Sequence, residues 1–382
     1  MFSLACHPEQ TRHSVRMTRT EAYLALNLIP QVGPVRIRRL IQALGSPESV
    51  LSASVSDLLR VEGIGSAQAE AIHQWDREGH LEKELQKVRQ RGLTLLTQED
   101  DLYPPLLKQV HDAPVLLYVW GELQKRDHHA IGVVGSRHAT IYGMNATKKL
   151  SFQIAYTGYT VISGLARGID TAAHEAALAA KGRTVAVIGS GIGRLYPPEN
   201  KALAERIAQQ GAVISEYPVD RPADRQTFPY RNRVVAGWGS GLLVVEAPVK
   251  SGSLITAQQA AEQGRTVYAV PGPIDKPTSS GCNRLIQQGA KLVMDGADIL
   301  DDLMVLFPTA PTAPKVEPPP PAVTLTLDEQ ILFNALTSDE LHIDELTSRS
   351  GLAPGTVNVN LMRLEMKRLI RALPGRRYVR VN

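Results

Sequence analysis

Residues 163–170 read Ser-Gly-Leu-Ala-Arg-Gly-Ile-Asp, so two glycines and Arg167 occupy one short turn. An apolar run, Tyr159–Ile162, precedes the turn, and an Ala-rich run, Thr171–Ala180, follows it. This order predicts a buried strand, a tight turn and a helix. The N-terminus of such a helix attracts anions through its unpaired N–H groups and its dipole. The stretch therefore predicts an α/β fold with an anion-binding turn.

Two neighbouring turns repeat this pattern. Gly132–Arg137 (Gly-Val-Val-Gly-Ser-Arg) follows a short apolar run, and Ile188–Gly191 (Ile-Gly-Ser-Gly) follows Thr184–Val187. Three glycine turns, two of them with an arginine, indicate a phosphate-rich ligand that is longer than a mononucleotide. The alternative is that the glycines only let strands turn sharply into helices, because a short glycine motif is a weak signal by itself.

Apolar runs alternate with helical patterns between about residues 110 and 305. The expected strands are Ala130–Val134, Thr160–Ile162, Thr184–Ile188, Ala212–Ser215, Gly241–Glu246, Thr266–Val270 and Lys291–Met294. The expected helices include Asn145–Ala155, Ala172–Ala180, Asn200–Gln209, Val234–Trp238 and Leu254–Glu262. This alternation predicts an extended Rossmann-like, mostly parallel sheet with helices on both faces. Ligands of such sheets bind at the carboxyl ends of the strands.

The N-terminal region is helical with short turns. Pro30–Ile37 and Val61–Ala69 each place a glycine before a helix, which is typical of SAM-like or helix–hairpin–helix units. The turn N–H groups of such units can hold a DNA phosphate. The alternative is a small helical bundle in which the turns serve only to pack the helices.

The C-terminal part combines a proline-rich segment with a short α/β pattern. Prolines crowd Pro308–Pro321, which predicts an extended, semi-rigid linker. The expected elements beyond it are helices at 328–335, 343–348 and 356–369 and strands at 370–373 and 378–381. This order predicts a winged helix. The basic residues of its third helix and wing are Arg363, Lys367, Arg368, Arg371, Arg376, Arg377 and Arg380. They favour contact with duplex DNA, and the alternatives are protein binding and a solvated basic face.

These patterns divide the 382-residue chain into three domains and a linker. We expect the N-terminal helical domain at 1–95, the Rossmann-like domain at 96–307, the linker at 308–323 and the winged helix at 324–382. The first ~18 residues are candidates for disorder. The formal net charge of +4 is compatible with a polyanionic partner.

Cysteine content and hydropathy argue against a zinc-binding, disulfide-rich, secreted or membrane-spanning protein. Cys6 and Cys282 are the only cysteines, which excludes zinc-type spacings and a disulfide framework. Neither a secretory signal nor an apolar run of membrane-spanning length is present. We therefore expect a cytoplasmic protein without a membrane span.

An aromatic residue lies beside two arginines in the segment 228–233. Phe228 suits stacking on a base, while Arg231 and Arg233 hold the backbone of the same strand. The alternative places Phe228 in the core and pairs the arginines with Glu216 or Glu246.

The segment 250–253 resembles a fourth anion-binding turn, with Lys250 as a point charge and Ser251 and Ser253 as donors. In contrast, the chain has no ATPase-type phosphate loop, no dinucleotide fingerprint and no metal-ligand spacing. Asp170 and His174 could share a helix face, but Asp170 suits the helix N-terminus better than a catalytic pair. We therefore expect a binding protein rather than an enzyme, with no cofactor and no metal.

Several motifs follow one another in one order within about 150 residues. They are Gly135–Arg137, Ser163–Asp170, Tyr196–Asn200, Ser215–Pro218, Phe228–Arg233, Val245–Ala247, Ser251–Ala257 and Gly281–Asn283. This series closely resembles the DprA/Smf family of bacterial DNA-processing proteins. The resemblance covers about residues 100–300 and, in outline, the flanking domains.

The resemblance implies a domain that binds single-stranded DNA, protects incoming strands during natural transformation and loads a RecA-type recombinase onto them. It also implies a homodimer formed through the Rossmann-like domain. The site residues carried over by motif are Ser136, Arg137, Gly164, Arg167, Phe228 and Arg231, with Lys250 as a further candidate. The residue patterns above add Arg233, Ser251 and Ser253.

Two rival functions remain at this point. One is a nucleotide-processing enzyme, because some Rossmann-like proteins with glycine turns cleave nucleotide glycosidic bonds; the Pro-Gly-Gly-x-Gly-Thr motif of that group is absent from this sequence. The other is a duplex-binding regulator led by the winged helix. Phosphate-binding turns and an aromatic residue, without a code for base edges, favour sequence-tolerant binding of single strands instead.

Overall fold

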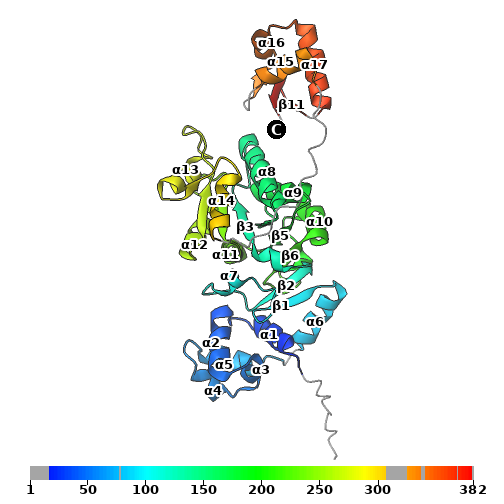
Figure 1. The fold of residues 1–382 in the computed structure, drawn as a ribbon. Coiled ribbons are helices and arrows are strands. Elements are labelled where there is room, and N and C mark those ends of the chain that lie inside the picture. The colour runs from blue at the N-terminus through cyan, green and yellow to red at the C-terminus, as the bar shows by residue number, and fades with distance from the viewer. Residues whose placement is uncertain (1–16, 77–78, 307–324, 337–339, 368, 381–382) are drawn as a thin grey trace, which may run out of the picture.

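A nine-stranded sheet forms the centre of the molecule (Figure 1). The computed structural model describes residues 17–76, 79–306, 325–336, 340–367 and 369–380. The N-terminal helices pack against the β1–β2 end of the sheet, and a small separate domain follows the sheet in sequence.

The central sheet is mostly parallel. Its strands are β1 (Thr94–Thr97), β2 (Leu116–Gly121), β3 (Ala130–Val134), β4 (Thr160–Ser163), β5 (Thr184–Val187), β6 (Ala212–Ser215), β7 (Gly241–Val244), β8 (Thr266–Ala269) and β9 (Lys291–Leu292). Their spatial order is β1-β2-β6-β5-β4-β3-β7-β8-β9. In this spatial order, every pair of adjacent strands from β6 through β9 is parallel. β1 pairs antiparallel with β2, and β2 pairs antiparallel with β6. The predicted strands and their parallel order are confirmed, and the β1–β2 pair is an extension that the pattern did not predict.

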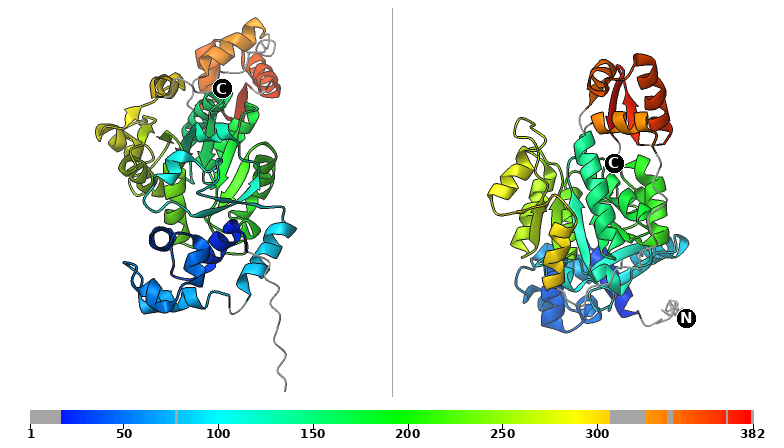
Figure 2. Two further views of the ribbon diagram at one scale, coloured as in Figure 1. Left: turned by 60° about the horizontal axis from the view of Figure 1, so that its bottom comes forward. Right: turned by 45° about the horizontal axis from the view of Figure 1, so that its top comes forward.

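Helices cover both faces of the sheet, as predicted (Figure 2). They are α7 (Pro105–Lys108), α8 (Ile141–Tyr156), α9 (Ile169–Ala179), α10 (Lys201–Gln210), α11 (Thr227–Trp238), α12 (Gly252–Glu262), α13 (Ser280–Gln287) and α14 (Ala297–Leu306). Side chains of β3 alternate between the two resulting cores because successive residues of a strand point to opposite faces. Ile131 and Val133 pack with α8, α9 and α14, while Ala130 and Val134 pack with α11 and α12.

Helix α11 begins at Thr227, seven residues before the predicted start at Val234. Phe228, Arg231 and Arg233 therefore all lie on one helix. Because an α-helix has about 3.6 residues per turn, Arg231 and Arg233 project about 200° apart. This geometry separates two arginines that the sequence analysis had grouped.

The N-terminal helices share a continuous core with the sheet. They are α1 (Arg19–Leu28), α2 (Pro34–Leu44), α3 (Pro47–Ser52), α4 (Val55–Leu59), α5 (Ser66–His73) and α6 (His80–Gln90). α2 and α5 begin at the predicted turns, with Gly33 and Gly65 as N-caps. Leu26 of α1 belongs to the same buried cluster as Tyr118 and Val213 of the sheet. β1 begins two residues before the predicted domain boundary at 95/96, and residues 1–16, with the predicted disorder, lie outside the described residues.

The C-terminal unit is a winged helix with its own core, as predicted. It contains α15 (Leu327–Ala335), β10 (Leu341–His342), α16 (Ile343–Ser350), α17 (Pro354–Met366), β11 (Ile370–Leu373) and β12 (Arg377–Arg380). β12 pairs with both β11 and the unpredicted β10. The predicted proline-rich linker at 308–323 lies outside the described residues.

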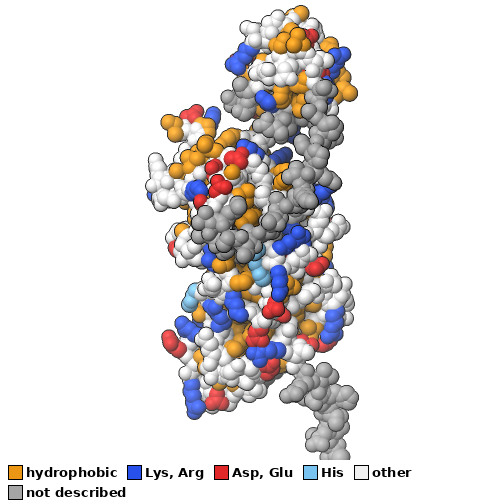
Figure 3. Space-filling model, viewed as in Figure 1, with side chains coloured by type: hydrophobic (Ala, Val, Ile, Leu, Met, Phe, Trp, Pro, Cys, Tyr) orange, Lys and Arg blue, Asp and Glu red, His pale blue; other side chains and the backbone are white. Residues whose placement is uncertain are grey.

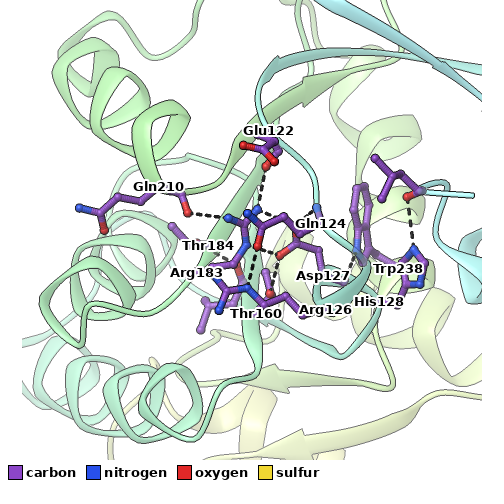
Figure 4. Close-up of polar contacts among 12 residues, drawn as sticks. Glu122, Gln124, Arg126, Asp127, His128, Thr160, Arg183, Thr184, Gln210 and Trp238 are labelled. Carbon is purple, nitrogen blue, oxygen red and sulfur yellow. Dashed lines mark hydrogen bonds and ion pairs between the residues drawn. The ribbon is translucent and has the colours of Figure 1, made fainter. Parts of the chain in front are cut away.

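A buried ion pair joins the amino ends of β3, β4 and β5 (Figure 4). Arg183 donates to both carboxylate oxygens of Asp127, each at 2.7 Å, and Thr160 donates to the same carboxylate. The other Arg183 donors bind the backbone carbonyls of Glu122 and Gln210. This network occupies the edge of the sheet opposite to the carboxyl ends.

Candidate nucleic-acid interface

The turns after β3, β4 and β5 meet at the carboxyl edge of the sheet, where they line a small hollow together with α11. The lining residues are Arg137, Gly164, Ala166, Arg167, Tyr196, Pro197, Phe228 and Arg231. We call this the Phe228 hollow. It brings together five of the predicted site residues, Arg137, Gly164, Arg167, Phe228 and Arg231, from three separate segments of the chain.

Two aromatic rings and an arginine form the wall of the Phe228 hollow. The Arg137 guanidinium lies 5.2 Å from the centroid of the Phe228 ring, within cation–π range. The Tyr196 ring is 5.8 Å from that of Phe228 and tilted by 54°. Arg137 and Tyr196 are exposed and Phe228 is half-buried, so ring surface and positive charge both face solvent. This combination is suited to stacking on a base beside its phosphate.

Arg231 forms a buried positive charge beneath the aromatic wall. Its Nη1 donates to the carbonyls of Gly164 and Val187, each at 2.5 Å, and its Nε donates to Asn232. A Cβ at residue 164 would overlap this guanidinium, which explains the glycine there. Burial lowers the pKa of Arg231, although an arginine stays charged in proteins. Among the described residues, no acceptor occupies its Nη2.

The turn after β4 holds a carboxylate of the protein itself. Asp170 accepts hydrogen bonds from the backbone N–H groups of Gly164 at 3.1 Å and Ala166 at 3.3 Å. Burial raises the pKa of Asp170, an effect that the nearby Arg231 opposes. These two N–H groups are therefore occupied by a carboxylate of the protein, where a ligand phosphate was expected.

The turn after β3 also holds a carboxylate of the protein itself. The Glu246 carboxylate accepts from the backbone N–H of Thr140, the N-cap of α8, at 3.2 Å and from its hydroxyl at 2.6 Å. A Cβ at Gly143 would overlap this carboxylate. The N-terminus of α8 is therefore already occupied by a carboxylate of the protein itself.

Arg167 is exposed and paired with Glu199, which does not line the hollow. Hydrogen bonding to Arg167 lowers the pKa of Glu199, and the same bond raises the pKa of Arg167. Because an exposed ion pair contributes little free energy, a phosphate can replace Glu199 at small cost.

Arg233 does not belong to the hollow, and its prediction as a site residue is corrected. It is 4% exposed and lies 3.0 Å from Asp112 and 2.7 Å from Glu216. Burial raises the pKa of Glu216 although Arg233 opposes this effect. The pairing with Glu216 that the sequence analysis left open is the one observed, because the turn of α11 directs Arg233 away from Phe228.

The remaining predicted residues lie beside the hollow rather than in it. Ser136 is buried, and its hydroxyl accepts from the N–H of His138. Ser251 caps α12 and its hydroxyl lies 2.7 Å from that of Ser253. Lys250 is exposed after β7, which is the neighbour of β3 at the same carboxyl edge.

Tyr196, Pro197 and Ala166 line the hollow although they were not predicted as site residues. The signal was present in the segment 196–200, but its role depends on Phe228, which is distant in sequence. Gly189, in the turn after β5, leaves room for the Phe228 ring, since a Cβ at residue 189 would lie 3.1 Å from that ring. The glycines thus allow side chains to pack closely at this edge.

The winged helix presents a mixed surface. Three of its predicted basic residues make internal contacts: Lys367 with Glu329, Arg377 with Glu340, and Arg380 over Phe333. The exposed apolar side chains of α17 are Val359, Met362 and Met366. The basic helix and wing are therefore less uniformly basic than the count of residues predicted.

The charged surface of the N-terminal helices is also mixed, with Lys or Arg beside Asp or Glu on the face in Figure 3. Within the described ranges, no cluster of three metal-ligating side chains occurs. No helix in the same ranges is long and apolar enough to cross a membrane.

Comparison with known families matches three parts of the chain. Residues 94–304 match the family described as DNA recombination-mediator protein A. Residues 316–376 match the DprA winged helix domain, and residues 23–74 match the SAM-like helix–hairpin–helix tandem.

Individual relatives extend this comparison. Protein Smf of Synechocystis sp. is 34% identical, over 94% of this chain and 98% of its own length. The X-ray structure of DNA processing protein A (DprA) from Streptococcus pneumoniae is 38% identical, covers 75% of this chain and 98% of its own, and has a TM-score of 0.66. DNA processing protein A from Helicobacter pylori, solved for its single-stranded DNA binding mode, is 26% identical, covers 56% of this chain and 96% of its own, and has a TM-score of 0.51.

Proposed function

The chain belongs to the DprA/Smf family of DNA-processing proteins, and from this premise we propose that it binds single-stranded DNA in the Phe228 hollow. The observation that carries the proposal is the contact between Arg137, Phe228 and Tyr196 at the carboxyl edge of the sheet. Rings stack on any base, and cations contact any phosphate, so binding is tolerant of sequence. The H. pylori relative, described for its single-stranded DNA binding, supports the same ligand.

Each side chain of the hollow has a distinct role in this proposal. Phe228 and Tyr196 stack on bases, while Arg137 and Arg167 contact phosphates. Arg231 supplies buried charge beneath the rings, seated by Gly164. Ser136, Lys250, Ser251 and Ser253 extend the contact along the same edge toward β7.

The test is fluorescence anisotropy with labelled single-stranded and duplex oligonucleotides of equal length. We expect wild type to prefer the single strand and Arg167→Ala to weaken that binding severalfold. Arg126→Ala removes an exposed arginine near the opposite edge and serves as the matched control. Duplex preference, or equal loss in both variants, would contradict a single-strand site at the hollow.

We further propose that the protein protects incoming strands and loads a RecA-type recombinase onto them in natural transformation, as a cytoplasmic mediator rather than an enzyme. Family membership supports this role. A loading assay tests it with recombinase and single strands coated by a single-strand-binding protein. The chain should accelerate filament formation, and a variant that cannot bind DNA should not. The absence of acceleration by wild type would contradict the mediator role.

A homodimer formed through the Rossmann-like domain is part of the same proposal. β9 is a two-residue strand at the edge of the sheet, and Leu292 and Met294 expose 41% and 71% of their surface there. Exposed apolar groups at a strand edge favour association. Sedimentation should therefore show a dimer in wild type and a monomer in Met294→Arg. A wild-type monomer at micromolar concentration would contradict this part.

Duplex DNA at the winged helix is a separate proposal, supported by the exposed Arg363, Arg371 and Arg376. The duplex arm of the anisotropy test addresses it. Replacing all three by alanine should weaken duplex binding and leave single-strand binding unchanged.

A further inference from the structure

A second hollow lies on the other side of the loop between β5 and α10, the segment 188–200. Its lining includes Trp120 of β2, Arg91 after α6, Arg194 and Pro198 of the loop, and Lys201 of α10. We call it the Trp120 hollow. Its volume of about 520 Å³ is in the range of sites that hold small organic groups.

Positive charge predominates in the Trp120 hollow. Arg194 and Lys201 are exposed and have no carboxylate partner among the described residues. Arg91 is the only one of the three cations with a partner, Asp220, at 3.9 Å. Glu205 is the one acidic residue of the lining. An anion entering the hollow would therefore replace little existing pairing.

Trp120 supplies an aromatic surface beside these cations. Its indole is half-buried and packs against the core shared by the N-terminal helices and the sheet, which holds the ring in place. β2 aligns Trp120 with Val213 of β6. The hollow thus resembles the Phe228 hollow in placing an aromatic ring beside exposed cations.

One loop connects the two hollows. Tyr196 and Pro197 line the Phe228 hollow, whereas Leu195 and Pro198 line the Trp120 hollow. Of the four residues 195–198, the inner two therefore line one hollow and the outer two line the other. The two hollows therefore have this loop as a common wall.

We infer that the Trp120 hollow binds the continuation of the same single strand, with a base on Trp120 and phosphates on Arg194 and Lys201. This inference rests on the proposed function of the Phe228 hollow. It assigns to the protein a longer footprint than the first hollow provides, and it makes affinity depend on the length of the strand.

The experiment compares oligothymidylates of about 5 and about 20 nucleotides, lengths that bracket typical single-strand sites. Binding of wild type, Trp120→Leu and the Arg194→Ala/Lys201→Ala double variant is measured against salt. Arg206→Ala is the matched control, because Arg206 is an exposed cation of α10 that lines neither hollow. Circular dichroism verifies the fold of each variant.

We expect the long strand to bind Trp120→Leu about tenfold more weakly than wild type, in the range of one lost base stack. The double variant should lower the slope of log affinity against log salt by about 1.4, since each phosphate contact of a single strand contributes roughly 0.7. The short strand should bind all variants as it binds wild type. Arg206→Ala should match wild type with both strands.

Three outcomes would overturn the inference. Unchanged binding of the long strand by both variants would remove the Trp120 hollow from the path of the strand. Equal weakening with the short and the long strand would make these residues part of the first site rather than a continuation. Failure of wild type to bind either strand would instead refute the proposed function, and the inference with it.

Discussion

The buried Arg183 at the amino edge of the central sheet differs from the exposed Arg137 and Arg167 at the carboxyl edge in how its donors are satisfied. At the amino edge, Arg183 is buried, pairs with both oxygens of Asp127 and donates to two carbonyls. At the carboxyl edge, Arg137 is exposed and lies over Phe228, and Arg167 pairs only with the exposed Glu199. An arginine whose side-chain nitrogens all donate within the protein, such as Arg183, thus has a structural role, whereas an exposed one such as Arg137 keeps donors free for solvent. The ion pair at the amino edge is buried within the fold, whereas the carboxyl edge leaves two cations exposed to solvent.

The largest effect that would test this comparison is expected from Asp127→Ala. Removing the carboxylate leaves Arg183 buried without its partner, which should lower the free energy of unfolding by about 3–5 kcal/mol. Thermal and denaturant unfolding measure the loss. Asp101→Ala, which removes an exposed acid, should change stability by less than about 0.5 kcal/mol. Weakened DNA binding by Asp127→Ala without a loss of stability would reverse the assignment of the edges.

The next effect concerns pH and His174, whose ring accepts or donates to Thr184 at the start of β5. Burial, with a smaller effect of Arg231, lowers the pKa of His174 from 6.5 to about 3. Below pH 6.5 His174 therefore binds a proton in the unfolded chain, whereas in the folded protein it does not bind one until about pH 3. Stability must fall as the pH drops through this window, by about 2 kcal/mol between pH 7 and pH 5.

The His174→Gln variant isolates this contribution. Its free energy of unfolding should change less than that of wild type between pH 7 and pH 5, as measured by denaturant titration at each pH. An identical pH dependence in both proteins would show that His174 is protonated in the folded state as readily as in the unfolded chain.

At the carboxyl edge, Phe228→Ala should weaken single-strand binding about tenfold, or about 1.4 kcal/mol, because a base loses its stacking partner. Phe152→Ala is the matched control, since Phe152 is an exposed phenylalanine of α8 outside the hollow. Anisotropy gives the affinities. If both variants bound alike, the ring would be only a packing residue.

The smallest effect is expected from Arg137→Ala. One lost phosphate contact should reduce the salt slope by about 0.7 and the affinity by less than about tenfold. Arg126→Ala, near the amino edge, should leave the slope unchanged. A titration from low to high salt separates the two variants, and equal slopes would mean that Arg137 does not contact phosphate.

The strands and glycine turns of the sheet were predictable because they depend on local patterns. The apolar runs at 130–134 and 212–215 coincide with β3 and β6. The β1–β2 pair was missed because only the four-residue helix α7 lies between its strands, so the pair falls outside the alternation of strands and long helices that the pattern shows. The start of α11 at Thr227 was missed because Pro229 was read as preceding the helix. Proline is tolerated in the first turn of a helix, and Pro229 lies in that turn.

The candidate site was predictable in its residue types but not in its electrostatics. The turns were expected to offer N–H groups to a ligand, yet Asp170 and Glu246 take them. Glu246 is 106 residues from Thr140 in sequence, so no local pattern reveals that contact. The separation of Arg231 from Arg233 likewise required the position of α11. Local sequence predicts which groups reach an edge, and tertiary structure decides which of them remain available.

The pairing of β1 with β2 has a practical consequence for dividing the chain into parts. A fragment that begins at residue 96 would lose half of β1 and all of α1–α6, and would expose the side of Tyr118 and Val213 that these helices cover. We expect such a fragment to aggregate, and we expect proteases to cut elsewhere before they release the N-terminal helices. The helical hairpins and the sheet should therefore be expressed, crystallised and mutated as one piece.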